Sequence, residues 1–155
     1  MKKLVAIILA LTLILTASVS IASACLVVDS SGIDWAAKTS DCKIGEMKSE
    51  KFTQKELDNA CKTVKKHFRT FNDCSLLTID YNEEESNSII NEYLQSHNTN
   101  ITSAENAIIL TSSFEALNNN AGMGSLGVGT HKGWRWIITR ESKNGKWRIV
   151  DNGYC

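Results

Sequence analysis

The sequence predicts an α+β fold in which a curved antiparallel sheet packs on a long N-terminal amphipathic helix. Two observations support this prediction. Between residues 53 and 71, apolar side chains recur every three or four positions, which is the spacing of one buried helix face. Residues 134–141 and 147–154 are rich in aromatic and β-branched side chains, and Asn144-Gly145, the preferred two-residue hairpin turn, lies between them.

The first residues have the pattern of an export signal. Lys2 and Lys3 precede an apolar run over residues 4–15, and small residues then lead to Cys25. A positive end, an apolar core and a small-residue cleavage site together form a signal peptide. We place this signal peptide at residues 1–24 and expect the protein to be exported.

Three outcomes at Cys25 stay open. Ordinary signal peptidase would release a secreted protein. Lipidation of Cys25 would hold the protein on the outer face of the cell membrane, because two acyl chains anchor a protein where one does not. The stretch from Leu4 to Ala24 would just span a bilayer as an uncleaved anchor. We favour the lipoprotein, which makes the membrane a partner through the lipid at Cys25.

After the signal peptide, the chain is one domain by length. Residues 25–50 carry scattered apolar positions with no period, so we expect a tether or a loosely docked arm, followed by the α+β domain over residues 51–155. The formal net charge is zero and no basic block alternates with aromatic residues. The sequence therefore predicts no nucleic-acid partner.

The chain has five cysteines, so one stays out of any intramolecular pairing. Lipidation of Cys25 would leave four, which allow three connectivities. A helix packed on a sheet would bring Cys61 near Cys155, and Cys42 could then reach Cys74 because the intervening arm is long enough. Free thiols remain the alternative to these two bridges.

The helix over residues 53–71 is the best-defined element. Thr53 and Glu56 form a T-x-x-E capping box, in which each side chain satisfies a free backbone N–H group of the other residue. The buried stripe of the helix is predicted to consist of Leu57, Ala60, Cys61, Val64, Phe68 and Phe71.

A strand, a short helix and a second strand follow. Residues 75–81 alternate as a strand does. One face of this strand holds Leu77, Ile79 and Tyr81. Asn82 and Glu85 form a second capping box at the start of a shorter helix. Residues 107–113 are the next predicted strand, and residues 118–133, with three consecutive Asn and five Gly, are a predicted flexible loop.

The Asn144-Gly145 turn fixes the register of the C-terminal hairpin. In this register, the cross-strand pairs are Glu141 with Arg148, Ile138 with Asp151, and Trp136 with Gly153. One face of the hairpin therefore collects Trp134, Trp136, Ile138, Trp147, Ile149 and Asp151.

Several segments resemble an uncharacterised family of exported proteins and lipoproteins of Gram-positive bacteria. The segments are Phe52–Phe71, Cys74-Ser75-Leu76, Trp136–Arg140, Gly145–Ile149 and Gly153-Tyr154. The order of elements resembles the cone-shaped fold shared by ketosteroid isomerase and nuclear transport factor. The resemblance implies that cone-like fold, and it transfers no catalytic residue.

Asp151 is the candidate catalytic residue, with Tyr81 as its polar partner. In the predicted register the carboxyl group of Asp151 lies among aromatic side chains, which would suit it to general acid or base catalysis. A ligand pocket would then be lined by Trp134, Trp136, Trp147 and Arg140. The alternative is that Asp151 is solvated or paired with Arg140, while the tryptophans belong to the core.

Two further patterns are not interpreted as sites. Residues 122–127 match G-x-G-x-x-G, but the motif lies before an antiparallel hairpin and no helix follows it, so a nucleotide cofactor is not predicted. His67, His97 and His131 lie in three different elements without ligands at a suitable spacing, so no metal site is predicted.

The preferred function is non-catalytic binding, by a cell-surface domain, of a small apolar or amphipathic ligand or of a protein partner. A small isomerase- or dehydratase-like enzyme that uses Asp151 is the first alternative. An interaction or inhibitor protein without a pocket is the second. A closed cavity that holds Asp151 beside another polar group would favour the enzyme.

Overall fold

The computed structural model describes residues 37–96, 101, 103–119, 121–122 and 126–154. The described residues belong to one compact unit, Trp35–Cys155. The predicted signal peptide and the side chains of Cys25, His97 and Cys155 lie outside them. Within the described part, no helix is both long enough and apolar enough to cross a membrane.

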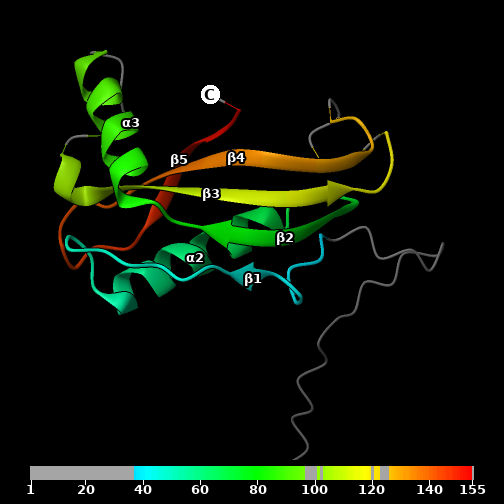
Figure 1. The fold of residues 1–155 in the computed structure, drawn as a ribbon, viewed down its shortest axis with the longest axis horizontal. Helices are drawn as coiled ribbons and strands as arrows, with labels where there is room; N and C mark the ends of the chain where they lie inside the picture. Colours follow the sequence, from blue (N-terminus) through cyan, green and yellow to red (C-terminus); the bar gives the residue numbers. More distant parts are fainter. Residues whose placement is uncertain (1–36, 97–100, 102, 120, 123–125, 155) are drawn as a thin grey trace, which may run out of the picture. The chain divides into compact units, whose positions relative to one another are not determined.

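Five strands form one sheet in the order β1-β2-β3-β4-β5, as Figure 1 shows. β1 runs parallel to β2, and the other three pairings are antiparallel. The strands are β1 (Lys43–Ile44), β2 (Cys74–Asp80), β3 (Ala107–Ala116), β4 (Gly129–Thr139) and β5 (Arg148–Gly153). The helices are α2 (Gln54–Phe68) and α3 (Glu83–Gln95), and a single 3₁₀ turn, η1 (Ala104–Asn106), precedes β3.

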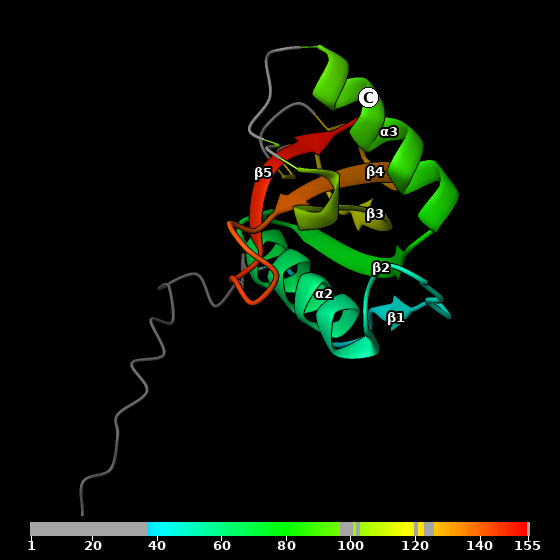
Figure 2. The same ribbon diagram turned by 90° about the vertical axis from the view of Figure 1, so that its left-hand side faces the viewer.

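The predicted fold class is wrong. The sheet is mixed rather than antiparallel, because β1 joins it in parallel. Two short helices of 15 and 13 residues accompany the sheet in place of one long N-terminal helix. The two helices lie against opposite faces, so the cone-like arrangement does not form (Figure 2). The apolar stripe of a helix predicts that it packs, but it does not predict which side of a sheet it covers.

Alternation along β3 divides the core into two clusters. Ile108 and Leu110 belong to the larger cluster, which contains the buried residues of α2. Ala107 and Ile109 belong to a smaller cluster with Ile89 and Ile90 of α3. Because successive strand residues point to opposite faces, α2 and α3 are held by the two sides of the same strand.

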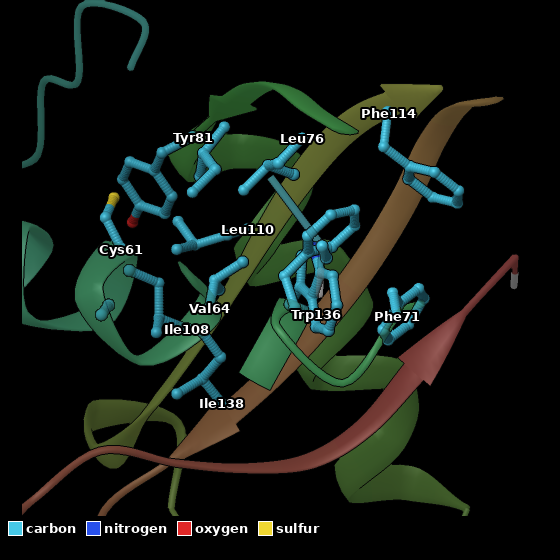
Figure 3. Packing of buried hydrophobic residues seen from close by; sticks show 14 of the residues in the cluster. Cys61, Val64, Phe71, Leu76, Tyr81, Ile108, Leu110, Phe114, Trp136 and Ile138 are labelled. Carbon is cyan, nitrogen blue, oxygen red and sulfur yellow. The ribbon is translucent and has the colours of Figure 1, made fainter. Parts of the chain in front are cut away.

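Aromatic rings dominate the larger cluster. Phe68 and Phe71 stack with ring centroids 5.0 Å apart, and Phe68 meets Trp136 edge-on at 6.3 Å. Figure 3 shows Phe71, Phe114 and Trp136 gathered toward one end of the cluster. The indole N–H group of Trp136 donates to the Ser112 hydroxyl at 2.8 Å, so this fully buried ring leaves no polar atom unsatisfied.

The predicted start of the helix over residues 53–71 is confirmed, and its predicted end is wrong. Thr53 and Glu56 form the complete capping box, and all six predicted stripe residues are buried. The helix ends at Phe68 rather than at residue 71. The N–H groups of Thr70 and Phe71 bond three residues back, which tightens the chain into a turn before β2. Asp73 then adopts a φ of 55°, a left-handed conformation that Asp tolerates better than most residues.

The predicted loose arm is wrong for its described part. β1 pairs with β2 through Lys43–Thr78 and Ile44–Ile79. Lys38 bridges to Ser75, and the side chain of Met47 is buried in the larger cluster. Two strand residues are too few to show a period, which explains why the sequence pattern did not reveal this strand. Residues 25–36 of the predicted arm lie outside the described residues.

The middle strands are longer and less regular than predicted. A β-bulge between Leu76 and Thr78 turns Leu77 outward, so Leu77 is exposed and Leu76 is buried instead. β3 continues to Ala116, three residues beyond its predicted end. β4 begins at Gly129, inside the segment predicted to be a loop.

The register of the C-terminal hairpin also differs from the prediction. The Gly145 N–H group donates to the Ser142 carbonyl at 2.8 Å, so the turn is centred one residue earlier than Asn144-Gly145. Neither Asn144 nor Gly145 has the positive φ that a type I′ turn requires. The cross-strand pairs are Thr139 with Arg148, Ile138 with Ile149, Ile137 with Asp151, Trp136 with Asn152, and Arg135 with Gly153.

Candidate functional site

A groove of about 1070 Å³ lies between α2 and the connection from β4 to β5. One rim is the exposed side of α2, and the other rim is the turn over residues 143–146 with the start of β5. Among the described residues, seven Lys and Arg side chains line the groove, and Glu56 is the one acidic residue there. The basic residues are Lys55, Lys62, Lys66, Arg140, Lys143, Lys146 and Arg148.

The floor of the groove is a polar and aromatic stack around Arg140. The guanidinium group of Arg140 lies 4.4 Å from the ring centroid of Trp147 and donates to Glu56 Oε1 at 2.5 Å. A second nitrogen, Nε, donates to Asn106 Oδ1 at 3.3 Å. The Trp147 indole N–H group donates to the backbone carbonyl of Glu56 at 3.1 Å. These contacts fix the floor in one arrangement.

Glu56 both caps α2 and balances Arg140. The Thr53 backbone N–H group donates to Glu56 Oε2 at 2.8 Å, and the Thr53 hydroxyl donates to the same oxygen at 2.7 Å. The bond from the Thr53 N–H group, followed by the bonds from Arg140 and the Thr53 hydroxyl, lowers the Glu56 pKa to about 2. Glu56 therefore stays ionised at neutral pH and neutralises the buried guanidinium group of Arg140, whose side chain is 4% exposed.

The rims carry cations that the floor does not neutralise. Lys55, Lys62 and Lys66 are exposed on α2, and Lys143 and Lys146 are exposed on the opposite rim. Among the residues that the structure describes, none of these five lysines forms an ion pair. The groove therefore holds an excess of positive charge, which attracts anions.

Arg148 contributes less to this excess. Its Nη2 atom donates to Glu141 Oε1 at 2.6 Å, and both side chains are largely exposed. The Glu141–Arg148 contact was expected from the sequence, although the two residues are not the direct cross-strand partners that the predicted register made them. The five lysines are therefore the unpaired cations of the groove.

The four residues predicted to line a pocket separate into two groups. Arg140 and Trp147 line the groove. Trp134 and Trp136 instead pack with Phe71, at ring-centroid distances of 5.7 and 5.6 Å. These two tryptophans belong to the aromatic core, which was the alternative interpretation.

Asp151 does not lie in an aromatic pocket. An extra residue in β5 places Asp151 opposite Ile137, on the face of the sheet that α3 covers. Its side chain is exposed, and the Tyr93 hydroxyl lies 3.5 Å from its Oδ2 atom. Arg140 pairs with Glu56 and not with Asp151. The predicted position of Asp151 beside Trp136 and Trp147 is therefore wrong.

Tyr81 lies far from Asp151 in the order of the strands. It follows β2, whereas Asp151 is in β5, and β3 and β4 separate these strands. The Tyr81 hydroxyl donates to Glu83 Oε2 at 3.3 Å, and burial raises its pKa to about 12. The structure thus does not bring the two predicted catalytic candidates together.

The described cysteines are free thiols. Cys42, Cys61 and Cys74 form no disulfide, which contradicts the predicted bridge between Cys42 and Cys74. Cys74 instead pairs in the sheet with Ala116, and Cys61 Sγ lies 3.7 Å from Met47 Sδ. Burial raises the pKa of Cys61 to about 12 and that of Cys74 to about 11, which makes both thiols poor nucleophiles. The predicted Cys61–Cys155 bridge involves a residue outside the described part.

His131 and Gly122 make contacts that stabilise the fold. His131 stacks on Phe114, and its two ring nitrogens contact the Tyr154 hydroxyl and the Gly127 carbonyl at 2.8 and 2.7 Å. The Gly122 N–H group donates to the Asn72 carbonyl at 2.7 Å. Across the described residues, no three His, Cys, Asp or Glu side chains lie close enough together to hold a metal ion.

The five groove lysines were not predicted as site residues. The sequence shows Lys55, Lys62 and Lys66 off the apolar stripe of the helix, where solvated lysines are ordinary. Lys143 and Lys146 flank the Asn144-Gly145 turn predicted from the sequence. Only the packing of α2 beside this turn brings the two sets together. No signal in the sequence separates these five lysines from ordinary surface lysines.

Comparison with known proteins identifies a family. The model of a domain of unknown function, DUF4829, matches residues 41–153. The matched region extends from just before β1 to the end of β5, so it contains both helices and the whole groove. No curated protein and no solved structure matches the chain. The match covers most of the chain, and the protein belongs to the DUF4829 family.

Proposed function

We propose that this domain is a non-catalytic binding module whose groove between α2 and the β4–β5 connection takes an anionic ligand. The observation that carries the proposal is the set of five exposed, unpaired lysines on the two rims. An anion placed between the rims would relieve the repulsion among these like charges and gain their attraction at once. The Arg140–Glu56 floor is already neutral, so it supports the groove without competing for the ligand.

A purely apolar ligand fits this groove less well. Trp147 is the large apolar side chain of the floor, and it is only 8% exposed because Arg140 covers it. A ligand that combines a negative group with an apolar part could still use the half-buried side chain of Ile149. We therefore keep the amphipathic ligand predicted from the sequence and specify that its polar group is negatively charged.

The enzymatic alternative has less support from the geometry. General acid–base catalysis requires the proton-transferring groups to meet within hydrogen-bond reach of one substrate. Asp151 lies in β5 and Tyr81 lies directly after β2, and β3 and β4 separate these two strands. Within the described residues, the groove contains one carboxylate, and that carboxylate is occupied by Arg140 and by the helix cap.

We propose further that the domain works outside the cell, on a lipid anchor at Cys25. The basic start, the apolar run and the small residues before Cys25 support this location, and so does the resemblance to exported lipoproteins. Changing Cys25 to Ala in a lipoprotein-competent bacterium should move the protein from the membrane fraction to the medium. Continued membrane retention of the Cys25→Ala protein would instead support an uncleaved anchor.

Binding of phenyl phosphate to the purified full-length protein tests the groove. We expect isothermal titration calorimetry to detect binding of this small anion with an apolar ring, and no binding of phenyltrimethylammonium. The double variant Lys62→Glu/Lys66→Glu should lose at least 10-fold in affinity, because two attractive contacts become repulsive.

A matched control separates the groove from the net charge. Lys38 and Lys132 are exposed and do not line the groove. The variant Lys38→Glu/Lys132→Glu changes the total charge equally and should bind phenyl phosphate as the wild type does. Equal losses in both double variants would show that binding is non-specific, and the groove would not be the site.

A further inference from the structure

The cationic rims are longer than one small anion needs. Lys55 and Lys66 are eleven positions apart on α2, so their α-carbons are separated by about 16 Å along the helix axis. Lys62 lies between them, one turn before Lys66. On the opposite rim, Lys143 lies in the turn and Lys146 follows it. The positive charge is therefore spread along the groove rather than concentrated at one point.

Among the described residues, the groove offers few of the fixed donors that usually hold a single phosphate group. Sites for one phosphate use a bidentate Arg or the free N–H groups at a helix start. Here, the buried Arg140 is paired with Glu56, and Thr53 accepts from the N–H group of Glu56 in the first turn of α2. What remains is a series of lysines, which are point charges on flexible stems. Such a series suits a flexible chain of charges better than one rigid anion.

We propose that the ligand of the groove is a linear polyanion whose repeating phosphate groups run along α2 and contact the two lysine rims. This inference rests on the proposed function and adds the class of ligand. Each phosphate group bound by a lysine releases condensed counterions from the polymer, so binding gains free energy in proportion to the number of contacts. A single small anion carries no condensed counterions and lacks this gain.

The aromatic residues of the groove favour a polymer without nucleobases. Proteins that bind single-stranded nucleic acid present exposed rings on which bases stack. Trp147, the one Trp that lines the groove in the described residues, has Arg140 over its face and donates its N–H group to Glu56. Because the indole face of Trp147 is not open to a base, the phosphate backbone is the part of the ligand that the groove can contact.

The test compares chain lengths on the full-length protein. Long-chain inorganic polyphosphate and tripolyphosphate are titrated at equal phosphate concentration. We expect the polymer to bind at least 10-fold more tightly per phosphate group. Five lysine contacts predict a slope of about −3.5 for the logarithm of affinity against the logarithm of salt concentration, which is a loss of about 100-fold between 50 and 200 mM NaCl.

The two double variants locate the polymer. Lys62→Glu/Lys66→Glu should make the salt slope shallower by about 1.5, because two of the five contacts are lost. Lys38→Glu/Lys132→Glu should leave the slope unchanged. Thermal melts of both variants verify that the substitutions at exposed positions leave the fold intact. An unchanged slope in the groove variant would overturn the inference.

Other outcomes distinguish this inference from the proposed function. Binding of phenyl phosphate without tighter binding of polyphosphate than of tripolyphosphate would overturn the polymer and leave the anion-binding groove. Binding of no anion would overturn both. Tighter binding of oligothymidylate than of polyphosphate would show contacts to bases, and tighter binding of heparin would show a preference for sulfated sugars. Either result would overturn the assignment to a base-free phosphate polymer.

Discussion

The two helices use opposite faces of one sheet in different ways. α2 buries five residues against a cluster of aromatic rings, whereas α3 buries three residues against a smaller aliphatic cluster. The exposed sides differ in charge as well. α2 carries four Lys, whereas α3 carries four Glu and neither Lys nor Arg. The face with the larger core is therefore also the face with the cationic groove.

This difference suggests a division of roles between the faces. A groove that holds like charges together is unfavourable in the absence of a ligand, and a large buried cluster beneath it can offset that cost. α3 adds two polar contacts with the sheet to its smaller buried cluster. The hydroxyl of Ser86 accepts the Ile109 N–H group at 3.0 Å, and Glu85 contacts Arg135 at 3.4 Å. α3 covers one face of the sheet, whereas α2 covers the other face and carries one rim of the candidate site.

Truncation of one buried side chain on each helix gives the largest expected contrast. Phe68→Ala should lower the free energy of unfolding by about 3–5 kcal/mol, because it leaves a cavity among fully buried rings. Ile90→Ala should cost about 2 kcal/mol, because the half-buried Tyr93 and Leu94 beside it can shift into the space. Urea denaturation measures both values. Equal losses would remove the distinction between the two faces.

The Glu56–Arg140 pair should make the stability of the α2 face depend on pH. The Glu56 pKa falls from its ordinary 4.5 to about 2 on folding, so the folded state favours the ionised carboxylate. The resulting stability, about 2–3 kcal/mol, is present above pH 4.5 and is lost as the pH falls toward 2. Glu56→Gln should lower stability at pH 7 and flatten this part of the pH profile. An unchanged profile in the variant would show that another group controls acid stability.

Removal of the cap should change stability by similar amounts in the two helices, which is the smallest of the expected contrasts. Thr53→Ala removes one half of a complete capping box and should cost about 1 kcal/mol. Asn82 accepts from the Glu85 N–H group without the reciprocal bond, so Asn82→Ala should cost about 0.5–1 kcal/mol. Chemical denaturation of the two single variants ranks them. A larger loss for Asn82→Ala would mean that α3 depends more on its cap than α2 does.

Local patterns predicted the elements better than their arrangement. The capping box and apolar stripe of α2 are confirmed, because both depend on residues within a few positions of each other. β1 was missed because its order depends on pairing with β2, more than thirty residues away. The hairpin register failed because simple alternation does not predict the extra residue near Val150 in β5. The bulge at Leu77 in β2 escaped prediction for the same reason.

The candidate site was predicted only in part for the same reason. Arg140 and Trp147 were predicted to line one pocket, and both line the groove. Asp151 was misplaced because a single extra residue in β5 moved its side chain to the other face of the sheet. The lysine rims had no marker in the sequence, because an exposed lysine opposite an apolar stripe is what any surface helix presents.

The sequence alone determined where α2 begins, which of its side chains are buried, and that Trp136, Ile138 and Trp147 lie on one face of the hairpin. These features follow from short-range periodicity and capping, which each segment carries by itself. Only the tertiary structure decided that β1 joins in parallel, that the helices take opposite faces, and that lysines from α2 and the β4–β5 turn meet across one groove. Those features depend on contacts between distant segments, and side-chain alternation cannot specify which segments meet.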